Sequence, residues 1–165
     1  MLELKKKRNL KKNKRAVVEP VNFVIAMIIL IYALMFGMDL LRIGLQMQSI
    51  SRLNTECARI VAAQGGIGGS APRGYPGGAD NYVTSSKFNQ EADKTTKRVK
   101  IEKNFKADYP QSVEYRKTFE TTMSFTYSWD MVNIVLPVKI RDGTFASTRT
   151  GVSEYKHNYD DWTGE

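Results

Sequence analysis

The feature that most restricts this chain is an uncharged, apolar run from Val21 to Met38, with the sequence VNFVIAMIILIYALMFGM. As an α-helix at roughly 1.5 Å per residue, the run spans about 27 Å, close to the hydrocarbon thickness of a bilayer. A chain of 165 residues could hardly cover an all-apolar helix on every side within one soluble core. The run therefore predicts a transmembrane helix at about 21–38.

A cleaved secretory signal is the competing interpretation of this run. The run is longer than the roughly 7–15 apolar residues of a signal, and no A-x-A cleavage site follows it. Pro20 precedes the run at a position suited to the first turn of a helix. After the run, the helical pattern continues through Asp39 and Leu40. We therefore expect an uncleaved anchor, closed by Asp39 and Arg42, which lie three residues apart on one helical face and can pair.

The charge distribution predicts the orientation of the anchor. The chain carries a formal net charge of +8, and residues 1–15 hold eight basic side chains and one acidic one, a net charge of +7. By the positive-inside rule, this basic tail (1–15) stays in the cytoplasm and the C-terminal part is extracytoplasmic. A fold that binds nucleic acid would instead spread cations over its surface, so no nucleic-acid partner is expected. The tail is expected to contact lipid headgroups.

The helical pattern does not stop at the membrane. We expect one long helix over 16–64, beginning near Val17 and ending near Gln64, because 39–64 contains no proline and carries one apolar stripe. The stripe consists of Ile43, Met47, Ile50, Cys57 and Val61. Asn54 interrupts it where another apolar residue would fit. The chain's own C-terminal domain or the same helix of neighbouring subunits must cover the stripe.

Residues 65–96 read as a connector. Their first part, 65–78, is rich in glycine and proline and predicts a flexible loop. It does not resemble a nucleotide-binding loop in context, because it follows a helix and lacks the Gly-Lys-Ser/Thr ending. A short helix is expected around 84–94.

The C-terminal part, 97–156, reads as strands. Apolar and polar residues alternate over 119–129 and, more weakly, over 97–105. The run 132–140 also alternates, but Pro137 reduces it to an edge strand or a loop. Asp142-Gly143 predicts a turn before a last strand over 144–155. We expect an α+β fold in which a small antiparallel sheet of three or four strands packs against the long helix, followed by a polar tail (157–165).

Residues with catalytic or ligand-binding chemistry are scarce. Cys57 is the only cysteine and His157 the only histidine. A small apolar role on a helix face is the simplest interpretation of Cys57, and an intermolecular disulfide is the alternative. His157, near Asp160 and Asp161, lies in the polar tail, where no rigid metal site is expected. The aromatic residues of 119–129 are expected in the core rather than on a stacking platform. We expect no catalytic, metal or cofactor site, and thus a non-enzymatic structural or interaction protein.

Glu19 stands out at the start of the apolar run. In the simplest interpretation it is an acid stabilised by the dipole at a helix N-terminus, by ~0.3–1 kcal/mol. In filament proteins, a carboxylate at this depth can instead pair with the N-terminal amine of a neighbouring subunit.

These N-terminal features resemble the TadE-like minor pseudopilins of tight-adherence (Flp-type) pili. The matching residues are the basic tail, Arg15-Ala16-Val17-Val18-Glu19, and Phe36-Gly37-Met38-Asp39 at the end of the apolar run. The resemblance in motif covers about 15–45. It implies a pilin-like fold and a membrane-anchored subunit of a type IV pilus-like (Tad) pilus, secretion or conjugation assembly.

The same resemblance implies partners and a processing site. The partners would be the lipid bilayer, other pilin-like or assembly-machine subunits, and a prepilin peptidase. A cut between Lys14 and Arg15 would place Glu19 fifth in the mature chain, and a chain left uncut would remain a permanent anchor. The alternative function is a bitopic membrane protein whose extracytoplasmic sheet is a binding module.

Overall fold

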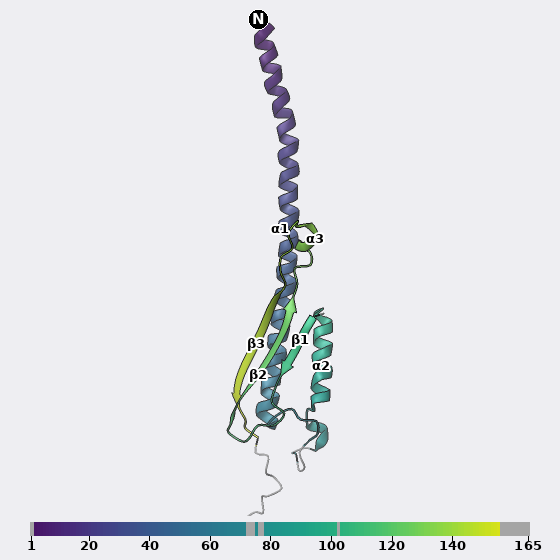
Figure 1. Cartoon of the computed structure of the whole chain (residues 1–165), viewed down its shortest axis with the longest axis vertical. Coiled ribbons are helices and arrows are strands. Elements are labelled where there is room, and N and C mark those ends of the chain that lie inside the picture. The colour runs from purple at the N-terminus through teal and green to yellow at the C-terminus, as the bar shows by residue number, and fades with distance from the viewer. Residues whose placement is uncertain (1, 72–74, 76–77, 102, 156–165) are drawn as a thin grey trace, which may run out of the picture. The chain divides into compact units, whose positions relative to one another are not determined.

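A long helix dominates the computed structural model, which describes residues 2–71, 75, 78–101 and 103–155, with side chains from Pro20 onward among them. Helix α1 runs from Leu2 to Gln64 (Figure 1). Its end at Gln64 confirms the prediction, whereas its start at Leu2 lies well before the expected Val17. Residues 2–17 contain no glycine or proline and are rich in lysine and leucine, both good helix formers, so the basic tail joins the helix. Pro20 consequently lies inside α1.

The described part of α1, Pro20–Gln64, is long and apolar enough to cross a membrane, and only 6% of its most apolar window is buried in the protein. This agrees with the predicted transmembrane helix and is consistent with a single-pass membrane protein. The chain forms two compact units, one comprising residues 1–41 and 129–140 and the other residues 42–128 and 141–165.

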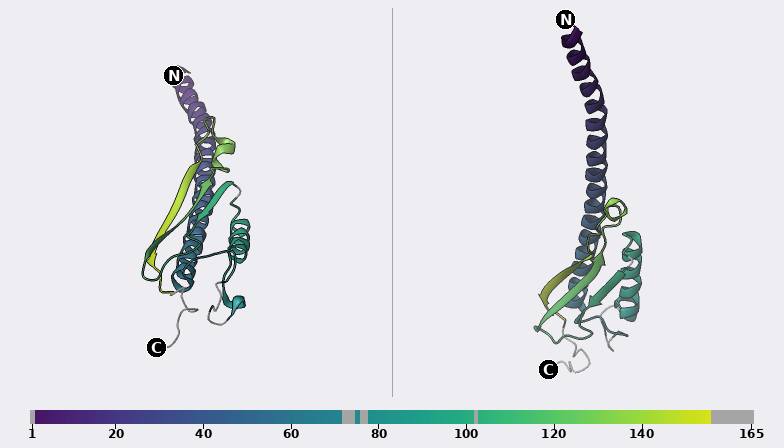
Figure 2. Two further views of the ribbon diagram at one scale, coloured as in Figure 1. Left: turned by 60° about the horizontal axis from the view of Figure 1, so that its bottom comes forward. Right: turned by 45° about the horizontal axis from the view of Figure 1, so that its top comes forward.

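The second unit contains the sheet. Strands β1 (Lys103–Asp108), β2 (Thr118–Tyr127) and β3 (Gly143–Val152) form an antiparallel sheet in the order β1-β2-β3. Within this unit, the strands run along the C-terminal part of α1, with helix α2 (Ser85–Arg98) beside β1 (Figure 1, Figure 2). A single 3-10 turn, η1 (Ala79–Asn81), precedes α2. This architecture is the expected α+β combination of a helix and a small antiparallel sheet.

Helix α2 confirms the helix predicted around 84–94 and also explains why the strand predicted at 97–105 begins late. The Thr84 hydroxyl caps its N-terminus by accepting a hydrogen bond from the Lys87 N–H (3.3 Å). At its C-terminus, Lys100 adopts a positive φ of 54° and the Ile101 N–H donates to the Thr96 carbonyl (2.9 Å). This helix-ending motif occupies 99–101, so β1 can start only at Lys103.

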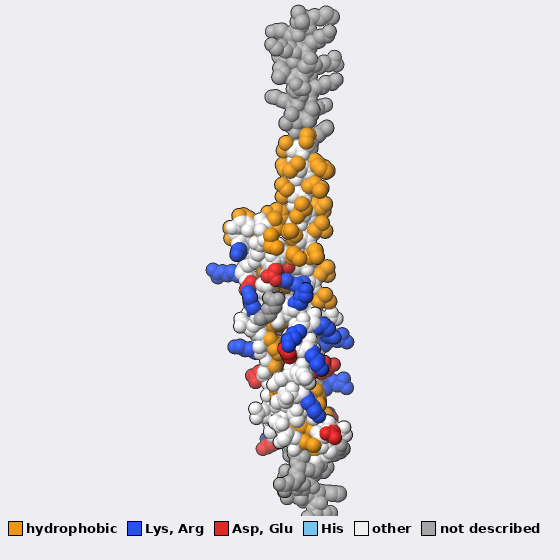
Figure 3. Space-filling model, turned by 90° about the vertical axis from the view of Figure 1, so that its right-hand side faces the viewer, with side chains coloured by type: hydrophobic (Ala, Val, Ile, Leu, Met, Phe, Trp, Pro, Cys, Tyr) orange, Lys and Arg blue, Asp and Glu red, His pale blue; other side chains and the backbone are white. Residues whose placement is uncertain are grey.

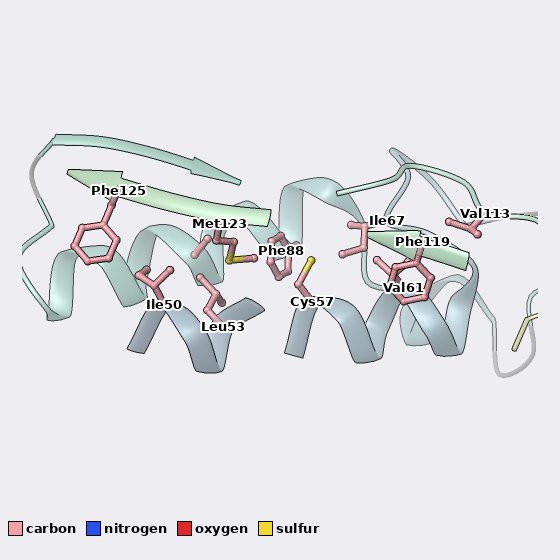
Figure 4. Close-up of a cluster of buried hydrophobic side chains, with 11 residues drawn as sticks. Ile50, Leu53, Cys57, Val61, Ile67, Phe88, Val113, Phe119, Met123 and Phe125 are labelled. Atoms are coloured by element: carbon pink, nitrogen blue, oxygen red, sulfur yellow. The ribbon is translucent and has the colours of Figure 1, made fainter. Parts of the chain in front are cut away.

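The core confirms the predicted stripe on α1. Ile50, Cys57 and Val61 are fully buried, and the chain's own sheet covers them. Figure 4 shows this side of α1 facing the aromatic and apolar side chains of β2 and α2. The alternation predicted for 119–129 is observed in β2, where Phe119, Thr121, Met123 and Phe125 are buried. Phe119 and Phe125 are therefore core residues, and no stacking platform forms from them.

The glycine-rich segment 65–78 was expected to be a flexible loop, but its first part is held firmly. The Val113 N–H donates to the Gly65 carbonyl (2.7 Å), and the Ile67 N–H donates to the Pro110 carbonyl (3.1 Å). Gly66 has a φ of 128°, and a Cβ atom there would lie 2.4 Å from the Gln111 carbonyl oxygen. The backbone at Gln111 lies too close to Gly66 for any residue but glycine to fit there.

The run 132–140 was expected to be an edge strand or a loop, and the structure contradicts the strand. Residues 129–140 contain a short helix, α3 (Val132–Val135), followed by an irregular segment, and they connect β2 to β3. The sheet therefore has three strands. The turn predicted at Asp142-Gly143 is not observed, because Gly143 is already the first residue of β3 and residues 128–142 connect this strand to β2.

Candidate functional site

The residues predicted to serve processing and assembly, Lys14, Arg15 and Glu19, all lie within α1. Their side chains fall outside the described part of the chain, as does His157. Their processing and assembly roles therefore stay predictions. The simplest interpretation of Glu19, an acid at a helix N-terminus, is wrong, because α1 begins at Leu2 and Glu19 lies far beyond its first turn.

A buried carboxylate lies within α1, directly after the predicted span. Asp39 has no exposed surface, and its two oxygens accept hydrogen bonds from the N–H groups of Met131 (3.3 Å) and Val132 (3.0 Å). These are N–H groups at the start of α3, which no residue within that helix can satisfy. Asp39 therefore fixes the segment 129–140 to α1, and this role was not predicted. The predicted pairing of Asp39 with Arg42 stays a prediction; the Arg42 Nη2 donates to the Ser128 carbonyl (2.6 Å).

Aromatic residues extend this attachment. The rings of Phe36 and Trp129 are stacked, with centroids 5.4 Å apart and planes 4° from parallel. The Tyr32 hydroxyl donates to the Val135 carbonyl (2.9 Å). One signal in the sequence could have identified this segment as a separate element. Trp129 ends the alternating run, and seven of the next eleven residues are large and apolar. The alternation within this segment favoured a strand instead.

A second buried polar group lies in the sheet-bearing unit. The Asn54 amide donates to the Ser147 carbonyl (2.6 Å) and accepts from the Thr121 hydroxyl (2.8 Å). Asn54 and Thr121 have no exposed surface. Asn54 thus occupies the apolar stripe because it joins α1 to both β2 and β3.

Cys57 lies in the same core and confirms its simplest interpretation, a small side chain packed on a helix face. Burial raises the pKa of its thiol to about 12, because the surroundings disfavour the thiolate. A thiol that is protonated and fully buried is a poor nucleophile, and an intermolecular disulfide is not accessible to it in this fold. Among the described residues, no group of three or more His, Cys, Asp and Glu side chains could hold a metal ion.

Helix α1 carries a second stripe, on the side away from its buried one. Leu34, Met38, Leu41 and Leu45 follow a 4–3–4 spacing, which places them on one helical face. Their side chains are 60%, 58%, 71% and 61% exposed. Further along the same face the side chains become polar, with Gln48, Arg52 and Arg59 all exposed. We call the four apolar residues the outer stripe; no described part of this chain covers it.

Comparison with known proteins leaves these features to be interpreted on their own. No protein-family model, no curated protein and no solved structure matches the chain.

Proposed function

We propose that this protein is a membrane-anchored, pseudopilin-like structural subunit of a type IV pilus-like (Tad) pilus, secretion or conjugation assembly. Its N-terminus is cytoplasmic and its sheet-bearing unit is extracytoplasmic. The observation that carries the proposal is the pair of opposite faces on α1: the chain's own sheet covers one face, while the outer stripe is exposed and continues past the end of the predicted span.

The position of the outer stripe supports an assembly of subunits. Leu41 and Leu45 lie three and seven residues beyond Met38, which is about 5 and 10 Å along the helix. Leucines at that distance lie outside the hydrocarbon layer, and water contacts them unless another part of the assembly covers them. The same helix of a neighbouring subunit is apolar at matching heights and can pack against them by interlocking side-chain ridges.

The polar continuation of this face fits the same arrangement. Arg52, Glu56 and Arg59 carry both signs of charge along the exposed side of α1. Opposite charges on adjacent helices would set the register in which subunits pack. In the membrane, Glu19 would neutralise the N-terminal amine of the next subunit, provided that the chain is cut between Lys14 and Arg15.

Disulfide crosslinking in membranes tests the packing. With Leu45→Cys, oxidation should join two copies of the full chain, because the outer stripes of neighbours face each other. Gln90→Cys, at an exposed position of α2, is the matched control and should give little crosslinking. The buried Cys57 should not react in either variant. If both variants remained monomeric after oxidation, the assembly would be refuted and the alternative, a bitopic binding module, would be favoured.

Two further measurements address the N-terminal prediction. Glu19→Ala should lower Leu45→Cys crosslinking, while Glu91→Ala, which removes an exposed acid from α2, should leave it largely unchanged. Mass spectrometry of the chain isolated from cells that contain a prepilin peptidase should find Arg15 at the N-terminus. An intact N-terminus would exclude processing and leave a permanently anchored subunit.

A further inference from the structure

The segment 129–140 has a composition unusual for an exposed connection between strands. Exposed connections are usually polar, whereas eight of these twelve residues are large and apolar. Ile134 and Val138 are 76% and 77% exposed, more than any large apolar side chain of the predicted span. In Figure 3, the orange hydrophobic side chains along α1 continue onto the bulge that this segment forms beside it. The remaining exposed apolar residues of the segment are Met131, Val135 and Ile140.

Contacts with α1 set the depth of the segment along the predicted span. The Tyr32 hydroxyl bonds the Val135 carbonyl, and Tyr32 lies six residues before Met38, the last residue of the span. Six residues correspond to about 9 Å of helix. The stacked pair Phe36–Trp129 holds the start of the segment nearer the end of the span. If α1 crosses a bilayer at 21–38, α3 therefore lies within the leaflet where the span ends.

Several backbone polar groups of the segment have hydrogen-bond partners, as that environment requires. A backbone group without a partner is expensive in a lipid-like medium. Asp39 accepts from two N–H groups at the start of α3. The Asn133 side chain satisfies both backbone groups of Ile140 at the end of the segment. It donates to the Ile140 carbonyl (3.0 Å) and accepts from the Ile140 N–H (2.7 Å). The Asp39 carboxylate and the Asn133 amide thus bond backbone groups of the segment, while Ile134 and Val138 are exposed, as are the charged side chains of Asp130 and Lys139.

We infer that the segment 129–140 is a second membrane-seated element, in which α3 inserts its apolar side chains among the acyl chains of the leaflet at the C-terminal end of the span. Trp129 lies at the level of the headgroups, where tryptophan is enriched in membrane proteins. Lys139 is exposed and can extend its ammonium group to lipid phosphates. The inference rests on the membrane anchoring in the proposed function, and on none of its assembly role.

Spin labels on the full chain test this inference in lipid nanodiscs that hold one chain each, so that no second copy covers the outer stripe. Single cysteines are introduced by Ile134→Cys, Val138→Cys, Leu34→Cys and Val152→Cys, and each is labelled with a nitroxide. Native Cys57 is buried, and the unsubstituted chain checks that it stays unlabelled. Collisions of each label with oxygen, which concentrates in hydrocarbon, are compared with collisions with a water-soluble nickel chelate.

Leu34 is the reference inside the predicted span, and Val152, 48% exposed on β3, is the apolar reference outside it. We expect the labels at 134 and 138 to behave as the label at 34 does, with oxygen collisions exceeding nickel collisions. The label at 152 should show the reverse. A water-like response at 134 and 138 beside a lipid-like response at 34 overturns the inference and leaves the anchor intact.

Two other outcomes also overturn it. If the label at 34 is water-accessible, α1 does not cross the membrane, and the anchor fails together with the inference. If the labels at 134 and 138 are shielded from both oxygen and nickel, and are broadened by spin–spin contact in discs that hold two chains, a second copy rather than lipid covers the segment.

Discussion

Replacing Asn54 by alanine should destabilise the sheet-bearing unit more than any exposed substitution on α1. The change removes the amide that donates to the Ser147 carbonyl and accepts from the Thr121 hydroxyl, all within the buried core. A buried polar group left without a partner costs about 1–3 kcal/mol, and two are left here. Allowing for partial relaxation around the smaller side chain, we expect a loss of about 3 kcal/mol in the free energy of unfolding.

This loss converts to a measurable shift in melting temperature. For a unit of this size, 1 kcal/mol corresponds to roughly 4–8 °C, so a loss of about 3 kcal/mol should lower Tm by roughly 12–24 °C. Thermal unfolding of the full chain in nanodiscs, followed by near-ultraviolet circular dichroism, measures the shift. The matched control is Thr55→Ala, since Thr55 is exposed and donates only to the Ser51 carbonyl within α1 (2.9 Å). This control should change stability by less than about 0.5 kcal/mol.

A double-mutant cycle with Thr121→Val separates hydrogen bonding from packing. If the two side chains stabilise each other, the double variant should be more stable than the sum of the single losses allows, by at least about 1 kcal/mol. Additive losses would show that the Asn54–Thr121 hydrogen bond contributes no stability, which leaves the bond to the Ser147 carbonyl and packing. If Asn54→Ala melted at the temperature of Thr55→Ala, the polar link between α1 and the sheet would carry no stability, contrary to our reasoning.

Three further predictions follow from individual residues. Gly66→Ala should lower the free energy of unfolding by ~1–3 kcal/mol, because φ is 128° and the new Cβ meets the Gln111 carbonyl. Gly69→Ala, where a Cβ meets no atom within 4 Å, should have little effect on the same denaturation curve. Cys57 should resist a thiol reagent at pH 8 until the chain is unfolded. Because folding raises the pKa of its thiol from 9.0 to about 12, the stability that the buried thiol contributes is complete below pH 9 and is lost as the pH rises toward 12. Prompt labelling of the native chain would contradict the burial. Asp39→Ala should speed hydrogen exchange at the N–H groups of Met131 and Val132 and leave the β2–β3 pairing protected; unchanged exchange at both would refute the cap.

The parts of the fold predicted correctly are those encoded by local periodicity. The apolar run, the stripe through Ile50, Cys57 and Val61, and the alternation in β2 each repeat with the period of one element, so they can be recognised without knowing what packs against them. The start of β1 was placed too early because the helix-ending motif at Lys100 depends on a positive φ that a lysine does not signal. The start of α1 was placed too late because a run of charge was interpreted as a tail, although its residues favour a helix.

The candidate site was predicted less completely, for a related reason. Lys14, Arg15 and Glu19 were chosen from motif and spacing, and their roles await the experiments above. Asp39 and Asn54 have no distinctive sequence context, because their partners are backbone and hydroxyl groups about 65–95 residues away in the chain. Only the folding of distant segments onto α1 shows why a carboxylate and an amide are buried there.

The run from Val21 to Met38 determined by itself that this chain contains a helix able to cross a membrane, because eighteen uncharged residues in succession have few other stable surroundings. The tertiary structure decided what lies beside that helix. The alternation in 132–140 is compatible with a strand and with a loop. Asp39, however, accepts hydrogen bonds from the Met131 and Val132 N–H groups, which are both free to point toward it at the start of a helix. That contact selects a short helix over an edge strand and leaves Ile134 and Val138 facing outward.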